Sequence, residues 1–244
     1  MVDKKIIKSR FKKSLKTYND NADIQNNMAE KLINMLKKNK FNSVFEIGCG
    51  TGNLTKQIKE KLSYTNYTAN DIVDESKRYI DKIIPDNNFI AGDIEELQLN
   101  SKFDLIISNA CLQWCSNFEG TISKLMKLLN PGGILAFSTF GNQNIIEVKN
   151  ILDIGLQYCS RENLKEILSS YNIIAFEEEV SKLYFETPHN VLQHLKYTGV
   201  NTFSMTSFNK AKLQAFDNTY KKHYLKDNKV SLTYHPVYVV LCAK

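Results

Sequence analysis

The stretch Val44-Phe45-Glu46-Ile47-Gly48-Cys49-Gly50-Thr51-Gly52-Asn53-Leu54-Thr55 decides the fold. Its apolar start predicts a buried strand, which three glycines at alternate positions then end. Leu54, Ile58 and Leu62 follow at i, i+4 and i+8, the spacing of one helix face. We therefore expect a strand, a tight glycine turn and a helix. Glycine allows positive φ and lets a ligand lie against the backbone, and the helix N-terminus offers unpaired N–H groups to a polar or anionic ligand.

The spacing of the glycines limits the class of ligand that the turn is expected to bind. They occupy positions 48, 50 and 52, and Asn53 stands where the dinucleotide-binding pattern G-x-G-x-x-G has its third glycine. Asp71 closes the next apolar stretch, 19 residues beyond Gly52, where an acid that binds ribose is expected. The pattern favours a ligand that contains adenosine and does not specifically require a pyrophosphate.

This arrangement resembles the first motif of the class I S-adenosylmethionine-dependent methyltransferases, which implies S-adenosylmethionine as cofactor. Asp71 would accept hydrogen bonds from the paired ribose hydroxyls, and Glu46 would receive the ammonium group. Asp93 would accept from the exocyclic amine of adenine. The cofactor-binding residues expected on this basis are Gln25, Glu46, Gly48, Cys49, Gly50, Gly52, Asn53, Asp71, Ile72, Asp93, Ile94 (on the adenine ring) and Asn109 (at the methionine part).

Composition excludes several other classes. The 244 residues suit one domain, no apolar run approaches the roughly 18 residues of a membrane span, and the cationic start lacks the apolar stretch of a signal peptide. The five cysteines form no C-x-x-C pair, so we expect reduced thiols in the cytoplasm, with neither a disulfide framework nor a metal site. The net charge is +6, but only three basic residues are Arg (10, 78 and 161), which disfavours a nucleic-acid partner.

Strands and helices alternate along the first part of the chain, which predicts a doubly wound α/β fold whose ligands bind at the carboxyl ends of the strands. The resemblance implies a mostly parallel, seven-stranded, Rossmann-like sheet. We expect one domain, 1–244, with N-terminal helices in 1–40, a cofactor-binding core in 41–141 and a helical lid, 188–227, inserted before the last strand. The elements expected are strands at 64–72, 88–94, 103–109, 134–140, 180–185 and 230–242, with Pro236 at an edge or bulge, and helices at 3–17, 23–38, 76–84, 118–129, 147–157, 162–169 and from 188 to a stop at Gly199.

Stretches outside the cofactor motifs resemble a narrower family, the malonyl-acyl-carrier-protein O-methyltransferases of biotin synthesis. They are Asn109-Ala110-Cys111-Leu112-Gln113-Trp114-Cys115, Phe137-Ser138-Thr139-Phe140-Gly141, Leu195-Lys196-Tyr197-Thr198-Gly199-Val200-Asn201, Leu232-Thr233-Tyr234-His235 and the N-terminal Arg10-Phe11, Tyr18 and Ala22-Asp23-Ile24-Gln25. The resemblance implies methyl transfer to the free carboxylate of a malonyl thioester on acyl carrier protein or coenzyme A.

A malonyl carboxylate has a pKa near or below ~4, so it is a nucleophile at neutral pH without a general base. Its burial does require a pairing cation and neutral donors. Lys196 is our first choice for the cation, with Arg10 as the rival, and Tyr18, Tyr234 and His235 are the expected donors. Gln25, Gln113 and Trp114 would shape the cofactor end of the pocket.

An acidic carrier protein could dock on the Lys-rich N-terminal helix and on lysines 210, 212, 221 and 222. The alternatives are a class I methyltransferase acting on another small carboxylate, a phenol or an amine, a nicotinamide oxidoreductase, and a regulatory protein that binds an adenosyl ligand without catalysis. Asn53 disfavours the oxidoreductase, and no basic aromatic platform for RNA is evident.

Overall fold

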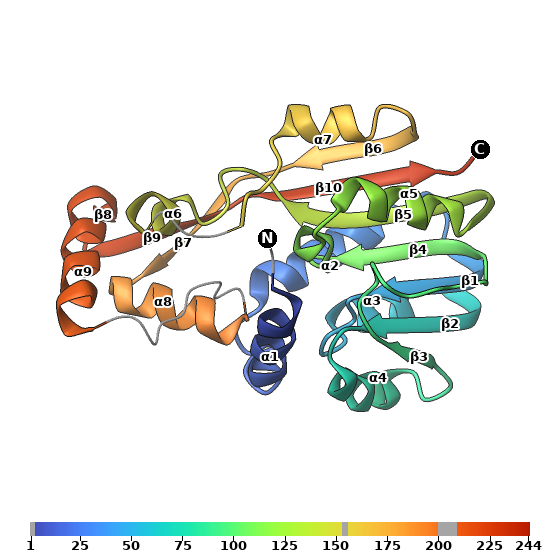
Figure 1. Ribbon diagram of the computed structural model, residues 1–244, viewed down its shortest axis with the longest axis horizontal. Coiled ribbons are helices and arrows are strands. Elements are labelled where there is room, and N and C mark those ends of the chain that lie inside the picture. The colour runs from blue at the N-terminus through green and yellow to red at the C-terminus, as the bar shows by residue number, and fades with distance from the viewer. Residues whose placement is uncertain (1–2, 153–155, 200–208) are drawn as a thin grey trace.

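The main sheet contains seven strands in the part of the chain that the computed structural model describes, residues 3–152, 156–199 and 209–244. Its strand order is β3-β2-β1-β4-β5-β10-β6, and β10 runs antiparallel to both of its neighbours (Figure 1). The mostly parallel α/β sheet expected from the sequence is thus confirmed. In chain order the strands are β1 (Lys40–Ile47), β2 (Ser63–Asp71), β3 (Asn88–Ala91), β4 (Phe103–Asn109), β5 (Leu129–Phe140), β6 (Asn172–Glu178) and β10 (Pro236–Cys242).

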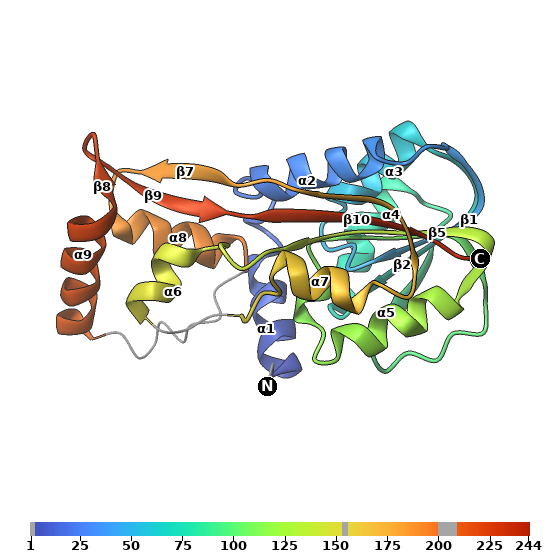
Figure 2. The same cartoon turned by 90° about the horizontal axis from the view of Figure 1, so that it is seen from above.

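Helices cover both faces of this sheet, which explains why its central strands are almost uniformly apolar. On β1, Val44 belongs to one buried cluster and the adjacent Phe45 to another, because successive side chains point to opposite faces. Figure 2 shows helices on the two sides of the sheet. The first cluster includes residues of α2 (Asp23–Asn34), α3 (Asn53–Lys61) and α4 (Lys77–Ile83), and the second includes residues of α5 (Phe118–Lys127) and α7 (Arg161–Ile167).

The structure corrects the sequence prediction for the last strands. The strand expected at 230–242 is two strands, β9 (Lys229–Tyr234) and β10, on either side of His235. Pro236 does not mark an edge or a bulge, because β10 lies between β5 and β6. The proline is tolerated as the first residue of its strand. Strand β6 was not predicted from the sequence.

A second, three-stranded sheet in the described residues has the order β7-β9-β8, with β7 at Ser181–Phe185 and β8 at Leu225–Lys226. It lies at one end of the molecule with α6 (Ile146–Leu152), α8 (Pro188–Tyr197) and α9 (Lys210–Tyr224) (Figure 1). Helix α8 begins as predicted, with the Thr187 side chain accepting from the backbone N–H of Asn190, and Gly199 follows it with φ +71°. Parts of the predicted 147–157 helix and of the 188–227 lid fall outside the described residues, and the division into one domain with a lid stays a prediction.

The N-terminal helix α1 (Lys4–Ser14) begins at Asp3, whose side chain accepts from the backbone N–H groups of Lys5 and Ile6. Figure 1 shows α1 between the main sheet and the second sheet. Ile7 is buried and clusters with Trp114 and Leu156, so α1 packs by a small apolar face. Across the described residues, no helix combines the length and the apolar character needed to cross a bilayer.

Candidate functional site

A cavity lies at the carboxyl ends of β1, β2 and β4, where ligands bind in folds of this architecture. The glycine turn forms one side of it and α1 contributes another. Most of the predicted cofactor residues line this cavity: Gln25, Glu46, Gly48, Cys49, Gly50, Asn53, Asp71, Ile72, Asp93, Ile94 and Asn109, together with the predicted donor Tyr18 and with Trp114.

The glycine turn is held to β2 by backbone hydrogen bonds. The N–H groups of Gly48 and Cys49 both donate to the carbonyl of Asn70, at 2.8 and 3.0 Å. Gly50 has φ +52°, and a Cβ placed there would meet no atom within 4 Å, so the turn leaves open space above its backbone. Gly52 does not line the cavity. It caps α3, and a Cβ there would overlap the side chain of Ile83 in α4, so its visible role is close helix packing.

Glu46 at the end of β1 is 1% exposed. Its Oε2 accepts from Thr55 Oγ1 at 2.9 Å and from the Tyr67 hydroxyl, whereas Oε1 has no hydrogen-bond partner among the described residues. Burial raises the pKa of Glu46 to about 7, although the bonds from Tyr67 and Thr55 lower it. A buried carboxylate with one free oxygen suits a cationic ligand group such as an ammonium.

Asp71 at the end of β2 is also buried. Its Oδ2 accepts from the backbone N–H of Gly50 and its Oδ1 from that of Val73, both at 2.7 Å. Burial raises the pKa of Asp71 to about 6, against the lowering effect of these N–H groups. Each oxygen keeps a further lone pair, so two adjacent hydroxyls could donate to the fixed carboxylate.

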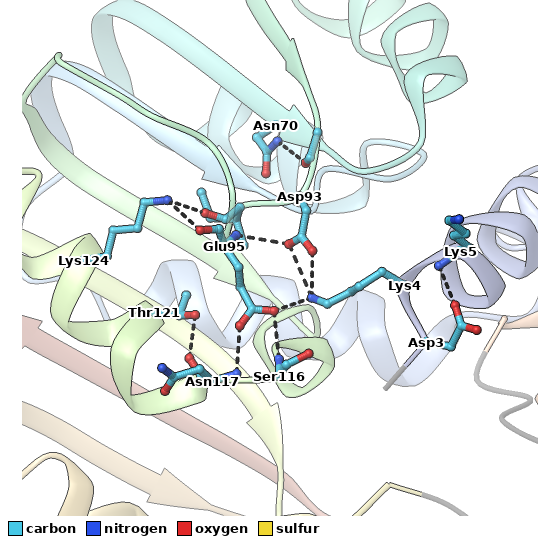
Figure 3. Close-up of polar contacts among 12 residues, drawn as sticks. Asp3, Lys4, Lys5, Asn70, Asp93, Glu95, Ser116, Asn117, Thr121 and Lys124 are labelled. Carbon is cyan, nitrogen blue, oxygen red and sulfur yellow. Dashed lines mark hydrogen bonds and ion pairs between the residues drawn. The ribbon is translucent and has the colours of Figure 1, made fainter. Parts of the chain in front are cut away.

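Asp93 and Ile94 follow β3 and line the same cavity. The Ile94 side chain is buried in the second apolar cluster. The Asp93 carboxylate contacts Lys4 of α1, which also contacts Glu95 and lines the cavity (Figure 3). Lys4 was not predicted as a site residue, because nothing in its local sequence connects it to residues about ninety positions away.

Asn109 and Gln25 are predicted site residues that the fold brings together. Asn109 Nδ2 donates to the Gln25 carbonyl at 2.9 Å, and Asn109 Oδ1 accepts from Ser138 Oγ at 2.6 Å. These bonds tie the start of α2 to the ends of β4 and β5, beside the glycine turn.

The rings of Phe140, Tyr234 and His194 form an aromatic cluster. Tyr234 is 1% exposed, packs against Phe140, and its hydroxyl lies 2.8 Å from His194 Nε2. Burial, Tyr158 and Tyr18 all raise the pKa of Tyr234. Tyr18 therefore lies within electrostatic reach of both Asp71, at the cavity, and Tyr234. His194 is a second residue of this region that was not predicted from the sequence.

The other predicted substrate residues do not line the cavity. Lys196 is exposed on α8, and Arg10 is half-buried on α1. Neither side chain has a polar partner among the described residues. His235 Nδ1 accepts from the Gln143 N–H at 3.3 Å, and its Nε2 lies 3.5 Å from Glu178 Oε2. The roles predicted for these side chains remain predictions.

Comparison with known proteins identifies the family. Residues 45–137 match the family model described as "Methyltransferase domain". The chain is 39% identical to the malonyl-[acyl-carrier protein] O-methyltransferase of Calditerrivibrio nitroreducens over 96% of this chain and 95% of that protein. It is 37% identical to malonyl-[acyl-carrier protein] O-methyltransferase 2 of Ilyobacter polytropus, over 99% and 98%. The chain belongs to the malonyl-[acyl-carrier protein] O-methyltransferase family.

The fold agrees with this membership. A putative methyltransferase from Bacillus halodurans superposes with a TM-score of 0.65 over 88% of this chain and 97% of that chain, at 12% identity, which supports the fold alone. The cofactor of this methyltransferase family is S-adenosylmethionine. The residues present fit this cofactor. The free oxygen of buried Glu46 suits the ammonium group, and the fixed carboxylate of Asp71 suits the ribose hydroxyls. The open space above Gly50 allows the cofactor to approach the backbone closely.

Proposed function

We propose that this protein is an S-adenosylmethionine-dependent O-methyltransferase that esterifies the free carboxylate of a malonyl thioester on acyl carrier protein, at the start of biotin synthesis. The observation that carries the proposal is similarity over nearly the whole chain to proteins of that name, including the regions outside the cofactor motifs. The ester would hide the charge, so that fatty-acid elongation could use the chain.

The cofactor side of the site is proposed as follows. Glu46 binds the ammonium group, Asp71 the ribose hydroxyls and Asp93 the exocyclic amine of adenine, while Asn109 and Gln25 lie against the methionine part. The bound cofactor supplies an electrophilic methyl group on a sulfonium. The protein positions the acceptor oxygen in line with that methyl and excludes water, and it need not remove a proton from an ionised carboxylate.

The acceptor would enter beside Tyr18. Tyr18 and Tyr234 are the proposed neutral donors, and burial keeps their hydroxyls protonated by raising their pKa values. Two cations remain candidates for the acceptor's charge. Lys196 matches the family stretch Leu-Lys-x-x-Gly, and Arg10 is half-buried on the helix that covers the cavity. Burial lowers the pKa of Arg10, as expected for a guanidinium without a carboxylate beside it.

Acyl carrier protein would dock mainly on α9. On α1, Lys4, Lys8 and Lys12 are paired with acids of the same chain, so this helix offers less free positive charge than its sequence indicates. On α9, Lys221 pairs with Asp217, whereas Lys210, Lys212 and Lys222 are exposed.

All five cysteines are free thiols, which supports the proposed cytoplasmic location.

The test is incubation with a radiolabelled methyl donor and a malonyl-loaded carrier protein, followed by a search for a base-labile methyl ester. Malonyl-coenzyme A, a phenol and an amine serve as competing acceptors. Labelling of the phenol or amine in place of the malonyl thioester would replace this proposal by the alternative of a small-molecule methyltransferase. Cofactor binding without transfer to any acceptor would indicate a regulatory protein.

A further inference from the structure

Lys4 links the N-terminal helix to the loop that follows β3. Its Nζ lies 3.3 Å from Asp93 Oδ1, 3.1 Å from Asp93 Oδ2 and 2.5 Å from Glu95 Oε2 (Figure 3). The Lys4 side chain is 26% exposed and that of Asp93 17%, so this ion pair is better shielded from water than a surface pair. Burial lowers the pKa of Lys4, but its hydrogen bonds to Glu95 and Asp93 raise it more, so the amine stays charged.

The loop itself has further hydrogen bonds to other parts of the chain. Glu95 accepts from the backbone N–H groups of Ser116 and Asn117, both at 2.8 Å. Lys124 of α5 donates to the carbonyls of Ile94 at 2.8 Å and of Glu95 at 3.2 Å. Figure 3 shows Lys124 on the side of the loop away from Lys4, and the Glu95 carboxylate between Lys4 and the N–H groups of Ser116 and Asn117. The backbone around Asp93 is therefore fixed without Lys4, and removing Lys4 should leave the loop in place.

The orientation of the Asp93 carboxylate depends on Lys4 more strongly than the position of the loop backbone does. Oδ1 has a local partner, the Glu95 N–H at 3.1 Å, whereas Lys4 Nζ is the partner of Oδ2 in the described residues. A carboxylate oxygen has room for a second donor beside Lys4. Without the lysine, Asp93 would face Glu95 with no cation between them, and its free oxygen could rotate away from the cavity.

Two further lysines lie on the same face of α1, one helical turn apart. Lys8 Nζ lies 2.9 Å from Asp74 Oδ1, and Lys12 pairs with Glu75. All four of these side chains are at least 35% exposed, so their pairs should contribute little to stability. They connect α1 to residues that follow β2, and Lys4 is the one of the three that lines the cavity.

We propose that Lys4 is a positioning residue for adenine recognition: it fixes Asp93 so that one carboxylate oxygen faces the exocyclic amine. This inference rests on the adenine contact proposed above for Asp93. It assigns a role in cofactor selectivity to the N-terminal helix, which lies outside the sheet and the glycine turn.

The experiment compares S-adenosylhomocysteine with its inosine counterpart, in which a carbonyl replaces the exocyclic amine, by calorimetry on the full chain. We expect Lys4→Met to weaken the binding of S-adenosylhomocysteine about tenfold and that of the inosine ligand less than about twofold. Only S-adenosylhomocysteine has the exocyclic amine that donates to the oriented Asp93 oxygen. Lys4→Arg should restore the preference for adenine. Lys5→Met is the matched control, because it removes the same charge from an exposed neighbouring side chain.

An equal loss for both ligands in Lys4→Met, or no loss for either, would overturn the role of Lys4. If Lys4→Met fails to fold, Lys4→Gln takes its place with the same expected change in preference. Asp93→Asn separates the two proposals. If the wild type prefers adenine, and Asp93→Asn loses that preference while Lys4→Met keeps it, the Asp93 contact stands and the Lys4 proposal fails. If the wild type shows no preference, both fail.

Discussion

The imidazole Nε2 of His194 lies 2.8 Å from the hydroxyl oxygen of Tyr234, which joins α8 to β9 at the edge of the aromatic cluster. Burial lowers the pKa of His194, so the ring is neutral at pH 7, and the tautomer with its proton on Nε2 can donate to the Tyr234 oxygen and leave the tyrosine proton for the substrate. We expect Tyr234→Phe and His194→Ala each to raise the KM for the malonyl substrate about tenfold, the loss of one substrate-orienting hydrogen bond. Steady-state kinetics gives KM, and calorimetry should show unchanged affinity for S-adenosylmethionine. His189→Ala is the control on the same helix, and a loss of cofactor affinity in the Tyr234 variant would contradict this assignment.

Asp71 provides the second prediction. Asp71→Ala should abolish measurable binding of S-adenosylmethionine, because no other carboxylate replaces the one held by the Gly50 and Val73 N–H groups. Isothermal titration calorimetry measures the affinity, with the exposed Asp86→Ala as the charge-matched control. Wild-type affinity in the Asp71 variant would remove this residue from the cofactor site.

Glu46 should make cofactor affinity depend on pH. Its pKa of about 7 in the free protein means that the carboxylate is only partly ionised near neutrality. Binding of an ammonium group favours the ionised form, so affinity should rise as pH increases from about 5.5 to 7.5, below the range where an α-amino group itself titrates. Glu46→Gln should weaken binding and flatten this part of the profile. A profile in Glu46→Gln as steep as that of the wild type would assign the titration to another group.

The same raised pKa has a consequence for stability without cofactor. Glu46 binds its proton more tightly in the folded than in the unfolded chain, so its contribution to the free energy of unfolding is fully present below about pH 4.5 and is lost as pH rises towards 7. Glu46→Gln should remove this loss. Thermal unfolding of wild type and variant from pH 5 to 8 measures it, and a difference between them that is independent of pH would contradict the raised pKa.

A comparison of two variants can identify the basic side chain that pairs with the malonyl carboxylate. If Lys196 pairs the malonyl carboxylate, Lys196→Ala should raise KM for malonyl substrate with cofactor binding intact, and Arg10→Ala should not. The reverse result would assign the role to Arg10. Arg10 is half-buried, whereas Lys196 is exposed. Lys16→Ala, exposed just beyond the N-terminal helix, is the control.

Docking of the carrier protein should depend on salt. Raising ionic strength should increase KM for malonyl-acyl carrier protein much more than for malonyl-coenzyme A, because only the protein presents an extended acidic surface to α9. Replacing Lys210, Lys212 and Lys222 by Gln should reduce that difference. Equal salt effects on both substrates would argue against a basic docking face.

The sequence by itself determined the strand, glycine turn and helix at the start of the sheet, and which polar side chains end the neighbouring strands. The glycine turn, Asp71 at the end of β2 and Asn109 at the end of β4 are read from local patterns, because each buried parallel strand is a continuous apolar run that ends at the ligand-binding edge. The later strands were harder to predict, since β6 is an edge strand that ends in Glu177 and Glu178, and since the switch between two sheets at His235 has no local signal.

Tertiary structure alone decided which distant side chains meet. The contacts of Lys4 with Asp93 and of His194 with Tyr234 join residues 89 and 40 positions apart. It also decided which face of α8 is buried, and that face carries Val191, Leu192 and Leu195 and leaves Lys196 in solvent. A motif fixes the type of residue at a position, but packing of the whole chain fixes the direction in which its side chain points.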